Sequence, residues 1–539
     1  MKRLAGFLAT AALALPVGCT DDDSFLDGET VKSEDGKADS SLLAMFIDLE
    51  FEGKLITDFS FDNRNTIEDQ LLYTVGQLNG FTAVGRIDKA EVTDIKKTSV
   101  GGKTQITYKA KLPVAWKKSN GMPTTVELKL PLDISSSGQT KFAEKYGHDC
   151  VDFGAHDVDA GSMFYYYRPR QSGCKIDAAD LHTVQAVASP SPTQTTGKFP
   201  EYNKVWEDGR LEVLAIFGKY EDGATSGDAG IDAYNTFVGS MKRELANKNL
   251  TTIPENVPNA PGVASPDIEF NATLPDGKKV HVVALMTDNV TTGLSQPAFR
   301  ARYEALSTRA DLIVYNGHAG LGTNVRALAQ AGEWVKGQYV IVYMNGCDTF
   351  AYIDDALFNA HKAINPDDTT GFKYIDIVNN AMPAFFHSMA GASMSLFRGL
   401  LDHANPSTYE QMFRGVDSSQ IILVSGEQDN EFTPGGGGTP ATWPGLTDAG
   451  TVKRGESKSW ATPTVEAGRY TFSITGTNDA DLYVRVGSAP TTSKFDCRPF
   501  KTGSNESCTV TLSQPAPIHV MVNGFSATAA KFDIVGKKD

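Results

Sequence analysis

The sequence predicts a mostly parallel α/β domain that lies between two β domains. Within 205–432, short apolar runs alternate with segments of helical periodicity, which is the pattern of a wound α/β sandwich. On either side, in 41–190 and 450–539, apolar and polar residues alternate along short segments bounded by Gly, Asn and Ser. That alternation is typical of antiparallel strands. A hydrophobic content of 41% over 539 residues supplies enough apolar surface for two or three cores.

The N-terminal residues have the features of an export signal. Lys2 and Arg3 precede an apolar segment that runs from Leu4 to Gly18 and stops at Cys19. The segment is too short to cross a bilayer as a helix, so 1–18 is predicted to be a signal peptide.

The run LPVGC, which ends at Cys19, resembles the signal of a bacterial lipoprotein. It departs from that pattern at Pro16, where Leu is usual. The resemblance implies a diacylglycerol on Cys19 and attachment to a membrane of the cell envelope. Thr20, rather than Asp, follows Cys19, which favours the outer membrane; ordinary secretion is the alternative. Residues 19–40 are acidic and poor in apolar side chains, and are predicted to be a disordered tether.

The overall charge argues against one class of partner. The net charge is −15, the pI is near 5.1, and the chain has no basic run. Nucleic acid is therefore not an expected partner.

The segment HDCVDFGAHDVDAG, residues 148–161, contains side chains that could bind a metal, namely His148, Asp149, Asp152, His156, Asp157 and Asp159. Their spacing matches no recognised metal site, so turn chemistry and surface solvation are the favoured interpretation and no metal site is predicted.

The N-terminal domain is expected to be an antiparallel β domain over 41–190. Its alternating segments are MFIDLEFEG, GFTAVGRI, TQITYKAKLPVAW, TVELKLPLDI and SMFYYYRPR. Residues 191–204 are rich in Ser, Thr and Pro at their start, and are predicted to be a linker.

The α/β domain over 205–432 is expected to consist of alternating strands and helices. The expected strands are 211–220, 279–287, 311–317, 339–346 and 420–426. The expected helices are 233–249, 297–310, 354–362, 373–390 and 407–414. Right-handed crossovers would place the carboxyl ends of the parallel strands at one edge of the sheet.

Two of these strands stop at Asn-Gly and then present a reactive side chain. ADLIVYNGHAG leads to His318, and YVIVYMNGCDT leads to Cys347. Functional residues of parallel sheets lie just past the carboxyl ends of the strands. His318 and Cys347 are therefore candidates for a general base and a nucleophile. A buried structural cysteine at a strand end is the alternative.

The cysteine count supports this assignment. Cys150 and Cys174 are near in sequence, as are Cys497 and Cys508. In an exported protein these four residues are predicted to form two local disulfides. Together with Cys19 in the signal, these assignments account for every cysteine except Cys347. The Cys347 thiol is therefore predicted to be available for chemistry.

The motifs NGHAG and NGCDT, each after a hydrophobic strand, resemble those of the caspase-like (clan CD) cysteine peptidases. The stretch AFFHSMAGASMSLFRG after Cys347 is most similar to the gingipain-type branch. The resemblance implies a caspase-like three-layer sandwich with a mostly parallel sheet. It also implies an oxyanion site made by the backbone N–H groups of Cys347 and of the residue after His318. The family has Gly after that His, whereas this chain has Ala319. Alanine does not readily adopt the same conformation if the backbone there needs a positive φ.

The expected chemistry is acyl transfer on a peptide or protein substrate. Cys347 would attack the carbonyl, His318 would protonate the leaving amine, and N–H groups of Ala319 and Cys347 would bind the oxyanion. The sequence therefore predicts an exported, lipid-anchored cysteine endopeptidase without a cofactor. One alternative is a catalytically inactive caspase-like binding or adhesion lipoprotein, supported by Ala319. Another is an acyl hydrolase that acts on non-peptide substrates.

The C-terminal residues have a distinct composition. Residues 433–449 are rich in Gly and Pro and are predicted to be a linker. ADLYVRVG and the DCRPF…SNESC pair within 450–539 strongly resemble the bacterial pre-peptidase C-terminal domain, a jelly-roll-like module. The resemblance implies an accessory role in binding or secretion, sometimes with calcium. Asp479 and Asp481 are candidate calcium ligands, although a structural role is the favoured interpretation.

Overall fold

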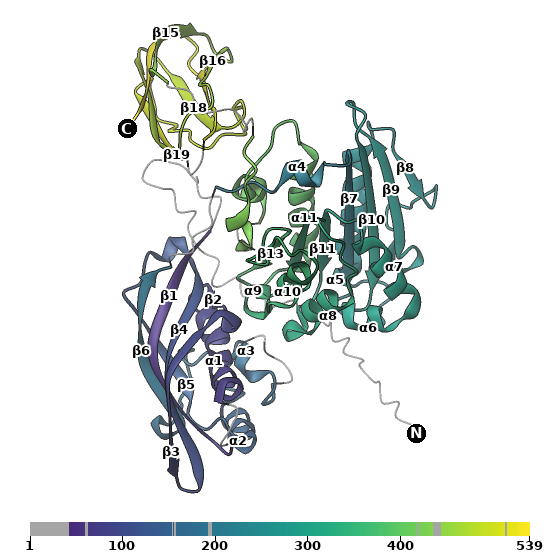
Figure 1. Ribbon diagram of the computed structural model, residues 1–539, viewed down its shortest axis with the longest axis vertical. Helices are drawn as coiled ribbons and strands as arrows, with labels where there is room; N and C mark the ends of the chain where they lie inside the picture. The colour runs from purple at the N-terminus through teal and green to yellow at the C-terminus, as the bar shows by residue number, and fades with distance from the viewer. Residues whose placement is uncertain are drawn as a thin grey trace, which may run out of the picture.

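The computed structural model describes residues 43–59, 63–153, 155, 158–191, 197–417, 420–434, 443–512 and 515–539. The predicted signal peptide 1–18, Cys19 and the tether 19–40 lie outside the described residues. So do the central parts of both predicted linkers, 192–196 and 435–442. Figure 1 shows a sheet domain at the N-terminal side in purple and blue, an α/β domain in teal and green, and a small β domain in yellow. In the described part, no helix is long and apolar enough to cross a membrane.

The N-terminal domain is built on an antiparallel sheet with strand order β2-β4-β1-β6-β5, and β3 pairs with β4. Its strands are β1 (Ala44–Thr57), β2 (Ala83–Gly85), β3 (Glu91–Val100), β4 (Lys103–Lys117), β5 (Thr125–Pro131) and β6 (Leu181–Pro190). Its helices are α1 (Asn63–Asn79), α2 (Ser136–Tyr146) and α3 (Met163–Tyr166). An antiparallel sheet was expected, and β1, β2, β4 and β5 overlap expected strand segments, whereas β3, β6 and the helices were not expected. The segment SMFYYYRPR was expected to be a strand, but it contains α3.

Helix α1 escaped sequence analysis because polar side chains lie on its buried face. Gln70 and Thr74 are fully buried. The Gln70 side chain donates to the carbonyl oxygens of Lys54 and Pro131 at 2.9 and 2.7 Å and accepts from the Tyr108 hydroxyl at 2.6 Å. These hydrogen bonds attach the helix to the sheet, and they break the apolar periodicity by which an amphipathic helix is recognised.

The α/β domain contains an eight-stranded sheet in the order β14-β13-β12-β11-β7-β10-β9-β8 among the described residues. The central pairs, from β13 to β10, are parallel, and the outer pairs are antiparallel. The strands are β7 (Arg210–Gly218), β8 (Thr251–Ile253), β9 (Asp267–Thr273), β10 (Lys279–Thr287), β11 (Leu312–Asn316), β12 (Val340–Asn345), β13 (Ile375–Asn380) and β14 (Ile422–Ser425).

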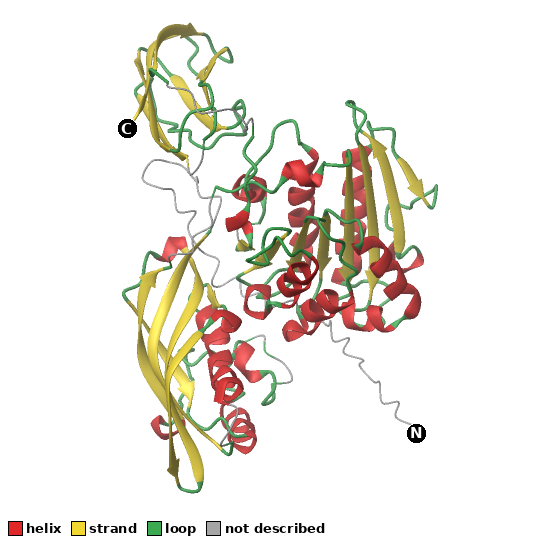
Figure 2. Cartoon of the chain, viewed as in Figure 1, coloured by secondary structure: helices red, strands yellow, loops and turns green. Residues whose placement is uncertain are grey.

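Helices flank this sheet on both faces (Figure 2). One apolar core joins the sheet to α5 (Ala229–Leu245), α11 (Phe386–Leu401) and α12 (Tyr409–Met412). A second core joins the other face to α6 (Val290–Ser295), α7 (Pro297–Ser307), α8 (Thr323–Ala331) and α10 (Ala356–Ile364). The short helices α4 (Tyr202–Val205) and α9 (Thr349–Tyr352) complete the domain. Helices on both faces explain why the central strands are apolar throughout.

One expected element of this domain is wrong. Residues 373–390 were expected to form a helix, but they contain strand β13 and only the beginning of α11. Every residue of β13 is buried, including Asp376, Asn379 and Asn380. A short run buried on both sides has no period of its own, and periodicity cannot distinguish it from part of a buried helix.

The C-terminal domain packs two antiparallel sheets, in the orders β15-β21-β17-β19 and β16-β20-β18. Its strands are β15 (Leu446–Val452), β16 (Ser457–Ala461), β17 (Gly468–Gly476), β18 (Ala480–Val486), β19 (Glu506–Leu512), β20 (Ile518–Gly524) and β21 (Ala530–Lys538). The predicted Cys497–Cys508 disulfide is present in this domain, and Cys150–Cys174 is present in the N-terminal domain.

Two helical glycines provide a test of the packing around α1. A Cβ on Gly76 would meet backbone atoms of α3 and Tyr167 at 2.6–2.7 Å, whereas a Cβ on Gly391 in α11 would meet nothing within 4 Å. Gly76→Ala is expected to destabilise the protein by about 2 kcal/mol because the backbone must move. Gly391→Ala is the matched control and is expected to stabilise it by about 0.5–1 kcal/mol through helix propensity. Chemical denaturation measures both, and equal effects would contradict the packing of α1.

Candidate active site

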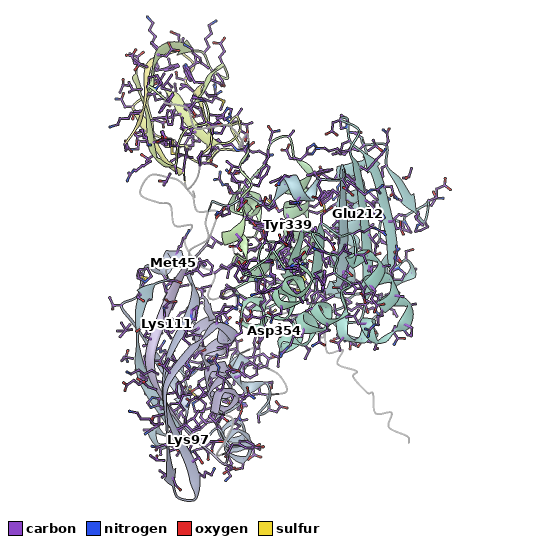
Figure 3. The ribbon with its side chains drawn as sticks, in the orientation of Figure 1. Met45, Lys97, Lys111, Glu212, Tyr339 and Asp354 are labelled. Atoms are coloured by element: carbon purple, nitrogen blue, oxygen red, sulfur yellow. A yellow bond between two sulfur atoms is a disulfide. The ribbon has the colours of Figure 1, made fainter. Side chains whose placement is uncertain are left out.

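The two candidate residues lie at the same edge of the central sheet. Strands β11 and β12 are parallel neighbours, and their register pairs Asn316 with Asn345. His318 and Cys347 each follow their paired asparagine by two residues. In Figure 3 the labelled Tyr339 marks the amino end of β12, which is the edge opposite these loops. The structure therefore brings together the two loops that sequence analysis selected.

Glycine allows the two loops to approach each other. A Cβ on Gly346 would lie 2.7 Å from the carbonyl oxygen of Gly317 and 3.2 Å from the amide nitrogen of Ala319. The first distance is shorter than real Cβ contacts, and both atoms belong to the backbone. Any larger residue at position 346 would push apart the loops that carry His318 and Cys347. This explains the Gly before Cys347 by contact rather than by an unusual backbone angle.

Buried amides hold the strand ends in place. The Asn345 side chain donates to Asn316 Oδ1 at 2.8 Å, and the Asn380 side chain donates to Asn345 Oδ1 at 3.0 Å. The Ser393 hydroxyl in α11 donates to Asn316 Oδ1 at 2.8 Å. All three asparagines are fully buried. The network fixes the carboxyl ends of β11, β12 and β13 relative to each other, because breaking it would leave buried polar groups unpaired.

His318 is oriented by the loop after a third strand, β7. Its Nε2 lies 3.0 Å from the carbonyl oxygen of Tyr220. Since a carbonyl only accepts, Nε2 carries a proton in this contact, and Nδ1 is the nitrogen that accepts a proton in the neutral ring. The rings of Tyr220 and Phe386 flank the imidazole, with centroids at 5.3 and 5.1 Å. A histidine held by an orienting acceptor is the arrangement that a general base requires.

Cys347 differs from the sequence prediction in its chemical state. Its side chain is buried, with 6% of its surface exposed, and Sγ lies 3.7 Å from the carbonyl oxygen of Ala384. No cysteine among the described residues is free, and Cys347 is disulfide-bonded. The prediction that its thiol is available is therefore wrong for this state of the protein. Both predicted local disulfides are present. The further inference that the Cys347 thiol is available failed because a disulfide does not require partners that are near in sequence.

Ala319 adopts an ordinary backbone conformation. Its φ is −66° and its ψ is −22°, a region open to any residue. The positive φ angles of this loop fall on Gly317, Gly320, Leu321 and Gly322, at 157°, 58°, 51° and 92°. Alanine in place of the family's Gly therefore causes no backbone strain at position 319. Ala319 no longer supports the alternative of a catalytically inactive protein.

Asp348, next to Cys347, is a buried carboxylate in a left-handed backbone conformation. Its φ is 50°, and 1% of the residue is exposed. Its two carboxylate oxygens have no hydrogen bond of normal geometry among the described residues. Burial raises the pKa of Asp348 to about 7, and the nearby Asn79, Arg168 and Tyr165 lower that pKa only in part. Asp348 is therefore near its titration point at neutral pH.

The N-terminal domain packs directly on this side of the α/β domain. One apolar core extends from its sheet to Ala319 and to helix α9. Phe350 of α9 contacts Phe46 edge to face at 6.1 Å, and Arg86 lies over its ring at 5.3 Å. The N-terminal domain is therefore part of the environment of both candidate loops.

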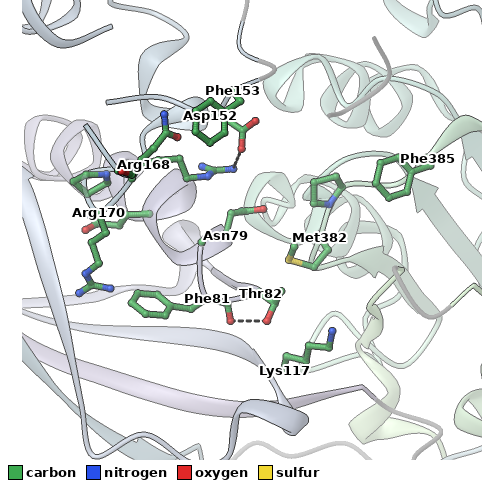
Figure 4. Close-up of a pocket in the computed structure, with 16 residues that line it drawn as sticks. Asn79, Phe81, Thr82, Lys117, Asp152, Phe153, Arg168, Arg170, Met382 and Phe385 are labelled. Atoms are coloured by element: carbon green, nitrogen blue, oxygen red, sulfur yellow. Dashed lines mark hydrogen bonds and ion pairs between the residues drawn. The ribbon is translucent and has the colours of Figure 1, made fainter. Parts of the chain in front are cut away.

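A cavity of about 450 Å³ lies between the two domains beside the site (Figure 4). The α/β domain contributes the segment after β13, through Met382, Pro383 and Phe385. The carbonyl of Met382 accepts from the Asp348 N–H at 3.4 Å. The same short segment therefore lines the cavity on one side and contacts the Cys347 loop on the other.

Sequence analysis missed the groups that support the two candidate residues. The carbonyl of Tyr220 leaves no mark in a sequence because every residue has one. Asn380 was placed inside an expected helix, which concealed its place at a strand end. The asparagines of the two NG motifs were visible, but they were interpreted only as the ends of strands.

Comparisons with known proteins identify the C-terminal domain. Residues 464–524 match the family described as bacterial pre-peptidase C-terminal domain. The chain is 55% identical over 51 residues to a virulence metalloprotease of Vibrio anguillarum, covering 10% of this chain and 8% of that protein. It is 53% identical over 64 residues to alkaline serine exoprotease A of Vibrio alginolyticus, covering 12% of each. The C-terminal domain is therefore a module shared with bacterial proteases.

These likenesses do not extend to the rest of the chain. The matched part of the chain spans about a tenth of the length of these curated relatives. The relatives match only the C-terminal module. Their names describe a metalloprotease and a serine exoprotease. A solved structure titled "Solution structure of vEP C-ter 100" is 33% identical and covers 19% of this chain and 98% of its own, with a TM-score of 0.15. A TM-score this low carries no argument about the overall fold.

The buried carboxylate of Asp348 makes stability depend on pH. Its pKa rises on folding from 3.8 to about 7, so its cost to stability is absent below pH 3.8 and grows until pH 7. Asp348→Asn keeps the shape and tolerates the left-handed conformation. It is expected to stabilise the protein by about 2 kcal/mol more at pH 8 than at pH 5, as measured by thermal unfolding.

Asp94 provides the matched control for this prediction. It has a similar φ of 52°, but its carboxylate is exposed, and the hydrogen bond from Lys109 lowers its pKa. Asp94→Asn is therefore expected to give no gain in stability at pH 8. Equal effects of Asp348→Asn at the two pH values would show that Asp348 does not titrate as a buried group.

Proposed function

We propose that the protein is an exported cysteine endopeptidase that uses Cys347 as nucleophile and His318 as base. The observation that carries this proposal is the shared register of Asn316 and Asn345, which places the two loops side by side at one sheet edge. The close contact at Gly346 supports it, as does the orientation of His318 by the Tyr220 carbonyl. The resemblance of NGHAG and NGCDT to caspase-like cysteine peptidases points to the same chemistry.

The reaction proceeds in two halves. The Cys347 thiolate attacks the peptide carbonyl, and the tetrahedral oxyanion is bound by backbone N–H groups, for which Ala319 and Cys347 are the candidates. His318 then gives its proton to the leaving amine, the C–N bond breaks, and a thioester forms on Sγ. Water, deprotonated by His318, attacks the thioester, and release of the acid restores the thiol.

This chemistry requires the thiol of Cys347, so the disulfide-bonded form is inactive in the proposal. A thiol reductant activates the protein by exchange, in which the reductant is oxidised and Cys347 is released as a thiolate. Peptide hydrolysis by the disulfide-bonded form is therefore expected only after reduction.

The C-terminal module and the N-terminal sequence support export. The module is shared with proteins named as bacterial proteases. We propose that the chain leaves the cytoplasm through the signal 1–18 and remains attached to the outer membrane by a lipid on Cys19, with free secretion as the alternative. The disulfides Cys150–Cys174 and Cys497–Cys508 use the other four cysteines. A lipid on Cys19 and a disulfide of Cys347 within the same chain therefore exclude each other in this proposal.

Asp481 is buried and pairs with Arg498 at 3.0 Å, and the Asp479 carboxylate accepts from the Gly503 N–H at 3.1 Å. These contacts favour the structural role expected for both residues over calcium binding, which has no part in the proposed reaction.

A binding protein without catalysis is the second candidate function. The burial of Cys347 and its disulfide favour it, because a nucleophile must be exposed to its substrate. The two candidates differ in whether reduction exposes a reactive Cys347.

Single substitutions test the two proposed catalytic residues. After reduction, Cys347→Ala and His318→Ala are each expected to lower kcat/KM for peptide hydrolysis by at least about 1000-fold, because the two groups act as a unit. Neither change removes a large apolar side chain, so unfolding free energy is expected to fall by only about 1 kcal/mol. His387→Ala is the matched control, since the side chain of His387 is 69% exposed, and it is expected to retain activity.

Two outcomes would contradict the peptidase proposal in different ways. Hydrolysis that persists in Cys347→Ala would exclude Cys347 as the nucleophile. A reduced wild-type protein that cleaves no peptide, and whose Cys347 does not react with an acyloxymethyl ketone, would favour the binding protein. The assay uses the full chain and a mixed peptide library.

Lipid attachment has its own test. Metabolic labelling with a fatty-acid probe is expected to mark the wild-type protein and not Cys19→Ser, because the proposed thioether forms on that sulfur. Cys347→Ser serves as the control, and its labelling is expected to equal that of the wild type. Release of unlabelled wild-type protein into the medium would overturn the anchor and leave secretion.

A further inference from the structure

The cavity between the N-terminal and α/β domains has an apolar lining with a positively charged side. Its apolar side chains come from both domains and are Phe81, Phe153, Pro169, Met382, Pro383 and Phe385. Three cations, Lys117, Arg168 and Arg170, and one anion, Asp152, also line it. A surplus of positive charge is unusual in a chain with a net charge of −15.

The three cations are not equally engaged within the protein. Arg168 pairs with Asp152 at 3.1 Å, and Arg170 lies 3.7 Å from the Glu127 carboxylate while its guanidinium stacks over Phe81. Lys117 has no ion-pair partner in the part of the chain that the structure describes. Figure 4 shows Arg168 turned toward Asp152 on one side of the cavity, with Lys117 on the other. Lys117 is therefore the cation available to a ligand.

The cavity is adjacent to the proposed nucleophile. Its wall segment 382–385 contacts the Cys347 loop twice, through the Met382 carbonyl to the Asp348 N–H and through the Ala384 carbonyl at 3.7 Å from Cys347 Sγ. A substrate whose scissile bond lies at Cys347 needs to extend past only this segment to reach the cavity. An extended peptide spans about 3.3 Å per residue, so a few residues suffice.

We propose that this cavity is a substrate-recognition subsite, built largely by the N-terminal domain, that takes an apolar side chain next to an acidic one. The inference rests on the proposed peptidase function and adds the substrate class. The apolar side chain packs against Phe153 and Met382, and the carboxylate pairs with Lys117. A volume of about 450 Å³ fits one large or two smaller side chains, and charged groups on a mostly apolar lining provide the specificity. Lys117 and Phe153 are positioning residues in this assignment.

Two substitutions test the subsite without disturbing the fold. Lys117→Glu reverses the charge available to the substrate, and Phe153→Ala removes an apolar side chain from a residue that is 77% exposed. Matched controls in the same domain are Lys96→Glu on β3, which is exposed, and Phe59→Ala, at a residue that is 53% exposed. The four proteins are expected to unfold at similar temperatures.

The assay measures kcat/KM for a synthetic peptide library that varies Glu, Gln and Lys beside an apolar residue at each position. The reduced wild type is expected to prefer Glu over Lys at one position by at least about tenfold, the ratio that one charge-assisted contact supplies. Lys117→Glu is expected to reverse that preference, and Phe153→Ala to raise KM with little change in kcat. Both controls are expected to behave as the wild type.

Failure of the subsite is distinguishable from failure of the peptidase. Cleavage with no change of preference in Lys117→Glu and no change of KM in Phe153→Ala would overturn the subsite and leave the peptidase. If no protein cleaves, fluorescence anisotropy measures binding of the same peptides to Cys347→Ala. Binding that prefers Glu and is reversed by Lys117→Glu would support the subsite, and the absence of binding or of preference would overturn it.

Discussion

The contact between the carboxyl ends of β11 and β12 is the constraint on which the rest of this site depends. Parallel pairing sets the register, the buried asparagines hold the strand ends, and Gly346 lets one loop touch the backbone of the other. Each device acts on the backbone before His318 and Cys347 have any role. A site built in this way has its geometry fixed by the core of the sheet, which supports precise positioning.

The parts of this arrangement that the sequence predicted are those that depend on local pattern. Apolar runs predicted the strands β11 and β12, and the NG motifs predicted where these strands end. Both candidate residues were therefore found without a structure. Helix α1 was missed because buried polar groups such as Gln70 interrupt its apolar periodicity. Strand β13 was missed because a short run buried on both faces has no period of its own. Tyr220 was missed because its contribution is a backbone carbonyl. The state of Cys347 was missed because disulfide pairing depends on distance in space.

The N-terminal domain has a closer relation to the site than a separate accessory domain would have. Its apolar core continues to Ala319 and α9, and three of its residues surround the carboxylate of Asp348. Burial of this carboxylate beside the nucleophile costs stability that grows from pH 3.8 to about pH 7 and is complete above it. Such costs are common where a site is prepared for function. The cavity between the domains follows from the same packing. In this view the N-terminal domain helps to select the substrate, while the α/β domain carries the chemistry.

The central claim is that His318 acts on Cys347. The most direct measurement is the rate of alkylation of Cys347 by iodoacetamide between pH 5 and pH 9, in the reduced wild type and in His318→Ala. If the imidazole assists the thiol, the wild-type rate rises with a midpoint well below the ordinary cysteine pKa of about 8.5, and the midpoint in His318→Ala returns toward that value. Identical profiles in the two proteins would show that the residues do not act together, and would contradict the account.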